Sequence, residues 1–123
     1  MRDFPSHAAG LSAANVAWLN EAFDLATNQQ SPGLMVIWQD NPFNAGADPA
    51  LQKTLVERAR TFGKPVVLVH GDTHVYRLAM QQWPAAPNLI EHQTFAVNNS
   101  DRWVEVTVDP ADPSVFRFAT IQS

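Results

Sequence analysis

Two histidines flank an aspartate in the segment His70-Gly71-Asp72-Thr73-His74. Neutral imidazoles and carboxylates are the ligands that zinc, manganese and iron take from proteins. Gly71 gives the backbone the freedom to form a tight turn, which would bring these side chains to one point. The segment is therefore a candidate metal site. The structural alternative is that one histidine fills the end of a strand and the other is solvated.

A second polar segment, Gln39-Asp40-Asn41, follows the apolar run Leu34–Trp38. The candidate metal segment likewise follows an apolar run, Val66–Val69, which is bounded by Lys64-Pro65 and by Gly71. Continuous apolar runs of this length are typical of strands buried on both faces. Parallel strands end side by side, so we expect residues 39–41 to lie beside residues 70–74. The alternative for residues 39–41 is a capping turn before Pro42.

Two amphipathic helices are predicted, one before each of these strands. We expect residues 1–11 to be irregular and Ser12 to be the N-cap of a helix that ends near Asn28. Asp48-Pro49 is a good N-cap and first-turn pair for a second helix, with Gly63 as its C-cap after Phe62. The expected apolar faces are Val16, Leu19, Phe23 and Ala26 in the first helix, and Leu51, Leu55, Ala59 and Phe62 in the second.

A strand, a helix and a second strand at this spacing form a βαβ unit, so the two buried strands should be parallel. After it we expect a short strand near Tyr76 and Leu78 and a loop over residues 80–88. Three antiparallel strands should follow, over Leu89–Val97, Trp103–Val108 and Val115–Ile121. Of the four tryptophans we expect Trp83 to be exposed in the loop, and the other three, Trp18, Trp38 and Trp103, to be buried. The predicted fold class is α/β with an antiparallel, α+β-like tail.

The length, net charge and cysteine content of the chain exclude several classes of protein function. The 123 residues are enough for a single domain, residues 1–123, with a real hydrophobic core. A net charge of -4 argues against a nucleic-acid partner, and the lack of cysteine excludes disulfides and thiolate zinc sites. No apolar run approaches the roughly 20 residues of a membrane span, and Met1-Arg2-Asp3 opens no signal peptide. We expect a cytoplasmic protein, or an exported one if a signal precedes Met1.

Several segments resemble one bacterial branch of the calcineurin-like metallophosphoesterases, in the same order along nearly the whole chain. They are Asn15–Leu19, Gln39–Phe43, Phe62–His74 with Tyr76-Arg77, Trp103–Pro110 and Val115–Phe118. The resemblance implies one half of a β-sandwich in which two sheets pack face to face with helices outside. It further implies a dinuclear site for divalent metals of the manganese, iron or zinc type, and hydrolysis of a small phosphoester substrate.

The family signature runs Asp-x-His, Gly-Asp, Gly-Asn-His, a lone histidine and finally Gly-His-x-His. Gly71-Asp72-Thr73-His74 stands at the last motif, so the resemblance implies that His74 is a metal ligand. Asp72 replaces the first histidine of that motif and would coordinate through oxygen. Gln39 falls near the position of the lone histidine, and His70 inherits no role. His70, Gln39, Asp40 and Asn41 are therefore expected to line the site rather than to hold the metal.

The first three motifs have no counterpart among the 38 residues that precede Gln39. The chain is therefore expected to be the C-terminal half of a metallophosphoesterase, from a truncated gene, an alternative start or a fragment, and inactive alone. Without the other half, one sheet face would be bare, which predicts a homo-oligomer, association with the missing half, or poor solubility. The alternatives are a metal-free α/β interaction module or remnant, and a small self-sufficient hydrolase that uses His70, Asp72 and His74.

Overall fold

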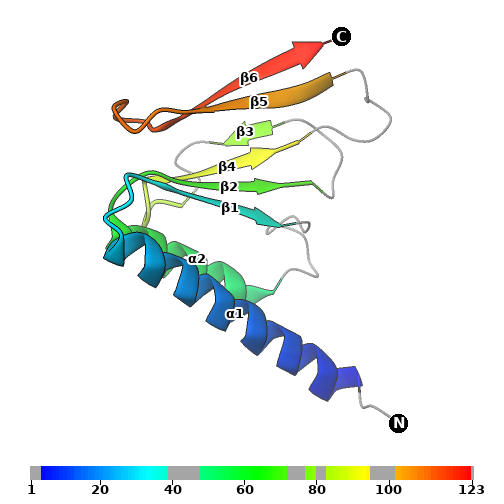
Figure 1. The fold of residues 1–123 in the computed structure, drawn as a ribbon. Coiled ribbons are helices and arrows are strands. Elements are labelled where there is room, and N and C mark those ends of the chain that lie inside the picture. The colour runs from blue at the N-terminus through cyan, green and yellow to red at the C-terminus, as the bar shows by residue number, and fades with distance from the viewer. Residues whose placement is uncertain (1–3, 39–47, 72–76, 80–82, 95–101, 123) are drawn as a thin grey trace.

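The computed structural model describes residues 4–38, 48–71, 77–79, 83–94 and 102–122. Its elements in chain order are α1 (Phe4–Asn28), β1 (Leu34–Trp38), α2 (Pro49–Phe62), β2 (Val66–His70), β3 (Arg77–Ala79), β4 (Leu89–Gln93), β5 (Arg102–Val108) and β6 (Phe116–Gln122). They form three layers: two helices, a central sheet and a two-stranded ribbon of β5 and β6 (Figure 1). This arrangement confirms the predicted mixed α/β class. None of the described helices is long and apolar enough to cross a membrane.

The central sheet has the strand order β1-β2-β4-β3. β1 and β2 pair in parallel, with Leu34 opposite Val66 and Trp38 opposite His70, so the predicted βαβ unit is confirmed. β4 is also parallel to β2, and only β3 runs antiparallel to its neighbour. The expectation that Leu89–Val97 forms one antiparallel set with Trp103–Val108 and Val115–Ile121 is therefore wrong, because β4 belongs to the central sheet and β5 and β6 pair with each other.

The side chain of Asn88 explains why β4 runs parallel to β2. The amide nitrogen Nδ2 of Asn88 donates to the carbonyl oxygens of Ala59 and Lys64, at 2.8 and 2.7 Å. These carbonyls lie where α2 ends and β2 is about to begin, and Val66 in turn donates its backbone N–H to the Asn88 carbonyl. Asn88 thus holds the start of β4 beside the start of β2, and the two strands must run the same way.

The caps of α2 are those that the sequence predicts. The Asp48 carboxylate accepts hydrogen bonds from the backbone N–H groups of Ala50 and Leu51, at 3.0 and 3.3 Å. Gly63 takes a left-handed conformation with φ of 71° and donates its N–H to the Ala59 carbonyl. Glycine adopts this conformation without the steric penalty of a Cβ atom, which is why the helix ends there.

The first helix begins at Phe4 rather than after Ser12, so the expected irregular segment at residues 1–11 is wrong from residue 4 onward. Pro5 is compatible with a helix because the first turn needs no N–H donor from it. Ala8 and Ala9 then favour the helix, and Gly10 opposes it by only about 1 kcal/mol. A single glycine is therefore too weak a signal to end this helix.

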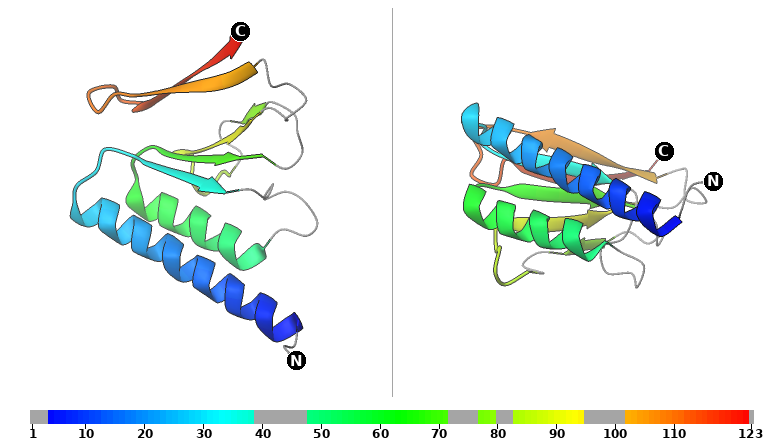
Figure 2. Two further views of the ribbon diagram at one scale, coloured as in Figure 1. Left: turned by 45° about the vertical axis from the view of Figure 1, so that its right-hand side comes forward. Right: turned by 90° about the horizontal axis from the view of Figure 1, so that it is seen from below.

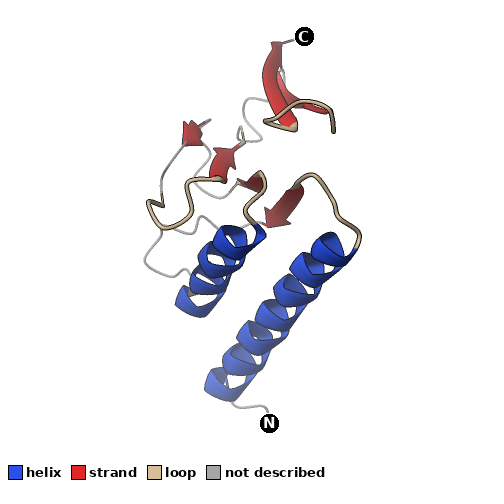
Figure 3. Cartoon of the chain, turned by 90° about the vertical axis from the view of Figure 1, so that its left-hand side faces the viewer, coloured by secondary structure: helices blue, strands red, loops and turns tan. Residues whose placement is uncertain are grey.

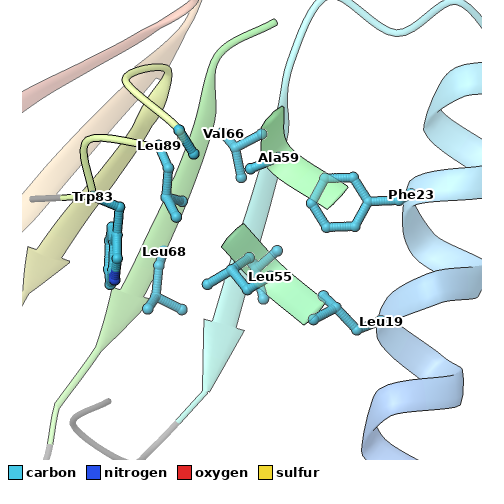
Figure 4. Packing of buried hydrophobic residues seen from close by; sticks show 10 residues of the cluster. Leu19, Phe23, Leu55, Ala59, Val66, Leu68, Trp83 and Leu89 are labelled. Carbon is cyan, nitrogen blue, oxygen red and sulfur yellow. The ribbon is translucent and has the colours of Figure 1, made fainter. Parts of the chain in front are cut away.

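The hydrophobic core lies between the helices and the central sheet (Figure 4). The helix residues Leu19, Phe23, Leu55 and Ala59 contact the strand residues Val36, Val66, Leu68 and Leu89, and all eight are at most 2% exposed. The predicted faces of both helices are thus confirmed. Figure 2 shows the two helices side by side on this face of the sheet.

The tryptophan predictions are wrong in three of four cases. Trp83 belongs to the core at 8% exposure, because the turn from Trp83 to Ala86 packs against the strands on the helix side. Trp18 and Trp103 are instead 50% and 47% exposed. Trp18 precedes Leu19 and so lies off the buried helix face, while Trp103 lies on the strand face opposite to Val104 and Val106.

The β5–β6 ribbon lies over the face of the sheet that the helices leave free, as the end-on view of the strands shows (Figure 3). Phe118 of the ribbon contacts His92 of β4, and Phe116 lies beside Gly33 at the start of β1. Val67 at the centre of this face is 1% exposed, but Ile37 of β1 is 66% exposed. The expectation that β1 is buried on both faces is therefore wrong. β1 is an edge strand of the sheet, and the β5–β6 ribbon does not bury Ile37 near its carboxyl end.

Candidate functional site

Three strands end together at what we name the carboxyl end of the sheet, defined by Trp38, His70 and Gln93. Trp38 of β1 is the register partner of His70 in β2, and His70 is the register partner of Gln93 in β4. Of the predicted site residues, the structure describes only His70. The other five, Gln39, Asp40, Asn41, Asp72 and His74, lie outside the described residues.

The described part of this end is built around a buried pair, His70 and Glu91. Both side chains have no exposed surface, and Nε2 of His70 lies 2.5 Å from Oε1 of Glu91. The other ring nitrogen, Nδ1, lies 3.0 Å from the carbonyl oxygen of Gly71. Alternation along the strands puts both side chains on the same face as Leu68, toward the helices. The pair therefore continues the hydrophobic core as a fully satisfied polar contact.

The two contacts of the imidazole fix its proton arrangement. A backbone carbonyl only accepts hydrogen bonds, so Nδ1 of His70 must carry a proton and donate it to Gly71. One further proton then lies between Nε2 and the Glu91 carboxylate. The pair is electrically neutral as a whole, whether that proton is on the ring or on the carboxylate. Neutrality is what allows two ionisable groups to be buried together.

The same contacts exclude His70 from metal ligation in this arrangement, because a ligand needs a ring nitrogen with a free lone pair. Among the residues that the structure describes, no group of three or more His, Cys, Asp or Glu side chains could hold a metal ion. The donor atoms of Asp72 and His74 are of the types that divalent metals take. Two donors fall short of the ligand set that a two-metal centre needs.

A second histidine of this region, His92, lies on the opposite face of β4. Its ring packs against Phe118, with ring centroids 4.3 Å apart. Burial lowers the pKa of His92 below its usual 6.5, and the nearby His70 lowers that pKa further. His92 is therefore neutral at neutral pH, and it serves to join the ribbon to the sheet.

Three polar residues at the end of β4 escaped the sequence analysis, and all three are buried: Glu91, His92 and Gln93. They follow the apolar pair Leu89-Ile90 in the way that Gln39-Asp40-Asn41 follows β1. This pattern indicates a strand end at the carboxyl end of the sheet only if β4 belongs to the central sheet, whereas the sequence predicts that it pairs with the antiparallel strands that follow. In a parallel strand, a polar triplet at the carboxyl end belongs with the other strand ends.

Comparison with known proteins adds no relative: no protein-family model, no curated protein and no solved structure matches this chain.

Proposed function

We propose that this chain supplies the C-terminal share of a metal-dependent phosphoesterase that hydrolyses a small phosphate ester. One observation supports the proposal most. Trp38 and His70 are register partners on adjacent parallel strands, so the strand ends that residues 39–41 and 71–74 follow in the sequence lie side by side. Polar residues at neighbouring strand ends are the usual location of sites in parallel α/β sheets.

Within this proposal His74 is a metal ligand, and Asp72 is a second one through its carboxylate oxygen. The bound divalent metal would polarise the phosphoryl oxygen and lower the pKa of a bound water. Gln39, Asp40 and Asn41 would line the site and contact the substrate with amide and carboxylate groups. The buried His70 takes no part in ligation, because both of its ring nitrogens are engaged.

We also propose that the chain is inactive alone. A two-metal hydrolytic centre holds its ions about 3.5–4 Å apart and needs ligands for both. A second polypeptide segment with the missing acidic and histidine motifs would have to complete the site. Its association would use the side of the sheet where Ile37 is 66% exposed.

The second candidate function is a metal-free interaction module. The observation that favours it is the set of large apolar side chains left at the surface, namely Trp18, Leu25, Ile37, Trp103 and Val108. Exposed apolar side chains of this size are found at protein contact sites when they are contiguous. In this alternative the His70–Glu91 pair is purely structural and the segment 71–74 binds nothing.

Calorimetric titration of the purified chain with Mn²⁺ and Zn²⁺ separates the two candidates. The phosphoesterase proposal predicts one weak site that is lost in His74→Ala. Binding should be retained in the matched control His7→Ala, because His7 lies on α1 and belongs to neither of the polar segments that follow β1 and β2. Absence of binding, or binding that survives His74→Ala, would reject the phosphoesterase proposal and favour the interaction module.

A further inference from the structure

The two edges of the central sheet differ in how they are protected. The sheet ends at β3 on one side and at β1 on the other. β3 has only three residues and begins with Arg77, and both strands of the β5–β6 ribbon contain charged residues. β1 carries no charge and no proline, and its register with β2 is uninterrupted. Proteins protect exposed strand edges with short strands, charges, proline or bulges. Among the edge strands that the structure describes, β1 alone lacks all of these.

Alternate residues of β1 direct their backbone groups away from β2. The N–H of Leu34 donates to the Pro65 carbonyl, which lies on the β2 side. Along a strand with one neighbour on each side, successive residues turn their N–H and C=O groups to opposite sides. Val36 therefore also faces β2, whereas Met35 and Ile37 face the open edge. No other strand in the described part of the chain pairs there. The edge can thus accept one more strand.

The flank of α1 on the same side of the molecule is apolar as well. Asn20 and Asp24 contact Arg58 of α2, so their side of α1 faces the second helix. Trp18 and Leu25 lie on the opposite flank, about 100° around the helix from the buried face, and are 50% and 57% exposed. Figure 2 shows α1 on the β1 side of the helix pair. This flank and the open strand edge therefore point in the same direction.

A second copy of the chain fits this surface by symmetry. A two-fold axis beside Val36 would pair Met35 of each copy with Ile37 of the other as antiparallel partners, so that every outward N–H meets an outward C=O. The five residues of β1 are as long as about 11 residues of helix, so the stretch of α1 that carries Trp18 and Leu25 runs beside β1. The same axis brings the two α1 flanks together in opposite directions.

The size and the charge of this surface also fit a second copy. Trp18, Leu25 and Ile37 together expose on the order of 350 Å² per copy. A standard interface buries about 800 Å² per partner, and the half-buried side chains of Leu34 and Met35 and the open backbone of β1 supply part of the remainder. None of these residues is charged, so the surface neither selects a charged partner nor repels its own copy. We expect a reversible dimer with a dissociation constant in the micromolar range.

We propose that the chain forms a two-fold homodimer in which β1 pairs antiparallel with β1 of a second copy and the α1 flanks pack together. The dimer needs no metal and goes beyond the proposed phosphoesterase function. The second segment in that function would use the same side of the sheet, so the dimer is the form that the chain takes alone. Well below the dissociation constant the chain is a folded monomer, and unfolding of the dilute chain therefore reports on one copy.

Hydrogen exchange of the unaltered full chain at two concentrations tests the strand pairing. We expect the amides of Met35 and Ile37 to exchange about tenfold more slowly well above the dissociation constant than well below it. The amides of Leu34 and Val36 face β2 and should be equally protected at both concentrations. Exchange at Met35 and Ile37 that does not depend on concentration would overturn the proposal.

Ile37→Pro tests the same edge by substitution. Proline at this position removes an outward N–H and an exposed side chain, but none of the hydrogen bonds to β2. We expect sedimentation equilibrium to show dimerisation about 100-fold weaker than in the unaltered chain. Ile37→Thr is the matched control, because it keeps the N–H and the branched Cβ, and it should weaken the dimer by about tenfold or less. An unchanged dissociation constant in a folded Ile37→Pro would contradict the pairing.

The helix flank is tested with two tryptophans of similar exposure. Trp18 on α1 is 50% exposed and Trp103 on the ribbon is 47% exposed. We expect Trp18→Ser to weaken dimerisation about tenfold and Trp103→Ser to leave it unchanged. The reverse result would move the interface to the ribbon and overturn the proposal. A chain that is monomeric at every concentration would also overturn it and leave the β1 edge to a different polypeptide. None of these measurements involves metal, so their failure leaves the phosphoesterase proposal to the Mn²⁺ and Zn²⁺ titrations.

Discussion

The rings of His92 and Phe118 lie against each other with their centroids 4.3 Å apart, and they join the central sheet to the β5–β6 ribbon. This contact buries an ionisable group between two layers. Its protonation state is therefore tied to the stability of the fold.

Acid should destabilise the chain through His92. The pKa of His92 in the folded state is lowered from 6.5 by burial and by His70. Below pH 6.5 the unfolded chain therefore binds a proton that the folded chain does not, and stability falls as the pH falls. The slope from this residue is at most about 1.4 kcal/mol per pH unit. Urea unfolding at pH 7.5 and 5.5 measures it.

The control for this prediction is His92→Phe, which keeps an aromatic ring against Phe118 but cannot titrate. Its stability should fall less between the two pH values than that of the unaltered chain. An equal fall in both proteins would show that His92 does not titrate differently in the folded and unfolded states.

The His70–Glu91 pair should be strongly coupled. His70→Leu or Glu91→Leu alone leaves one buried ionisable side chain without its partner, which destabilises a protein by about 3–5 kcal/mol. The double substitution leaves no such group and should be destabilised by clearly less than the sum of the two singles. Urea unfolding of the four proteins gives the coupling, and strict additivity would be incompatible with the contact.

Gly33 should resist substitution because of the ribbon. A Cβ atom at this position would lie 2.9 Å from the Phe116 ring and 3.0 Å from the Pro65 carbonyl oxygen. The Phe116 ring and the backbone at Pro65 would both have to shift, so Gly33→Ala should destabilise by about 1–3 kcal/mol. Thermal unfolding measures this, and the additional change Phe116→Leu should recover part of the loss.

Gly63→Ala is the informative comparison for Gly33. Its Cβ would meet nothing within 4 Å, but φ at this position is 71°. The penalty there is backbone strain alone, about 1 kcal/mol, and Phe116→Leu should not relieve it. Relief of both alanine variants by Phe116→Leu would mean that the ribbon does not contact Gly33 specifically.

Two of the three tryptophans whose burial the sequence does not reveal should differ sharply in their effect on stability. Trp83→Ala removes a side chain from the core and should destabilise by about 3–5 kcal/mol, whereas Trp18→Ala should change stability by about 0.5 kcal/mol or less. Urea unfolding measures both effects. Similar losses in the two variants would mean that Trp83 is not packed as described.

Local signals in the sequence were sufficient for the elements whose chemistry is local. Asp48 and Gly63 bound α2 because one side chain caps the first N–H groups and one residue adopts a positive φ. The apolar run that begins at Val66 predicts β2, because a strand buried on both faces needs consecutive apolar residues. Such features depend on few neighbours, so they can be recognised without knowledge of the fold.

The features that the sequence did not reveal depend on contacts between distant residues. Glu91 joins the site only because β4 is parallel to β2, and that direction is fixed by the contacts of Asn88 with Ala59 and Lys64. Trp83 is buried because its turn folds back on the sheet. No spacing rule applied to β4 by itself predicts these long-range contacts, so the His70–Glu91 pair was missed although His70 was singled out.

The central proposal is a metal site that this chain shares with a second polypeptide segment. Native mass spectrometry of the purified chain after dialysis against Mn²⁺ and Zn²⁺ tests it most directly. We predict that the chain retains one weakly held cation, because Asp72 and His74 are too few donors for two. Two tightly held cations per chain would contradict a site that needs ligands from a second segment, and would instead describe a complete hydrolytic centre.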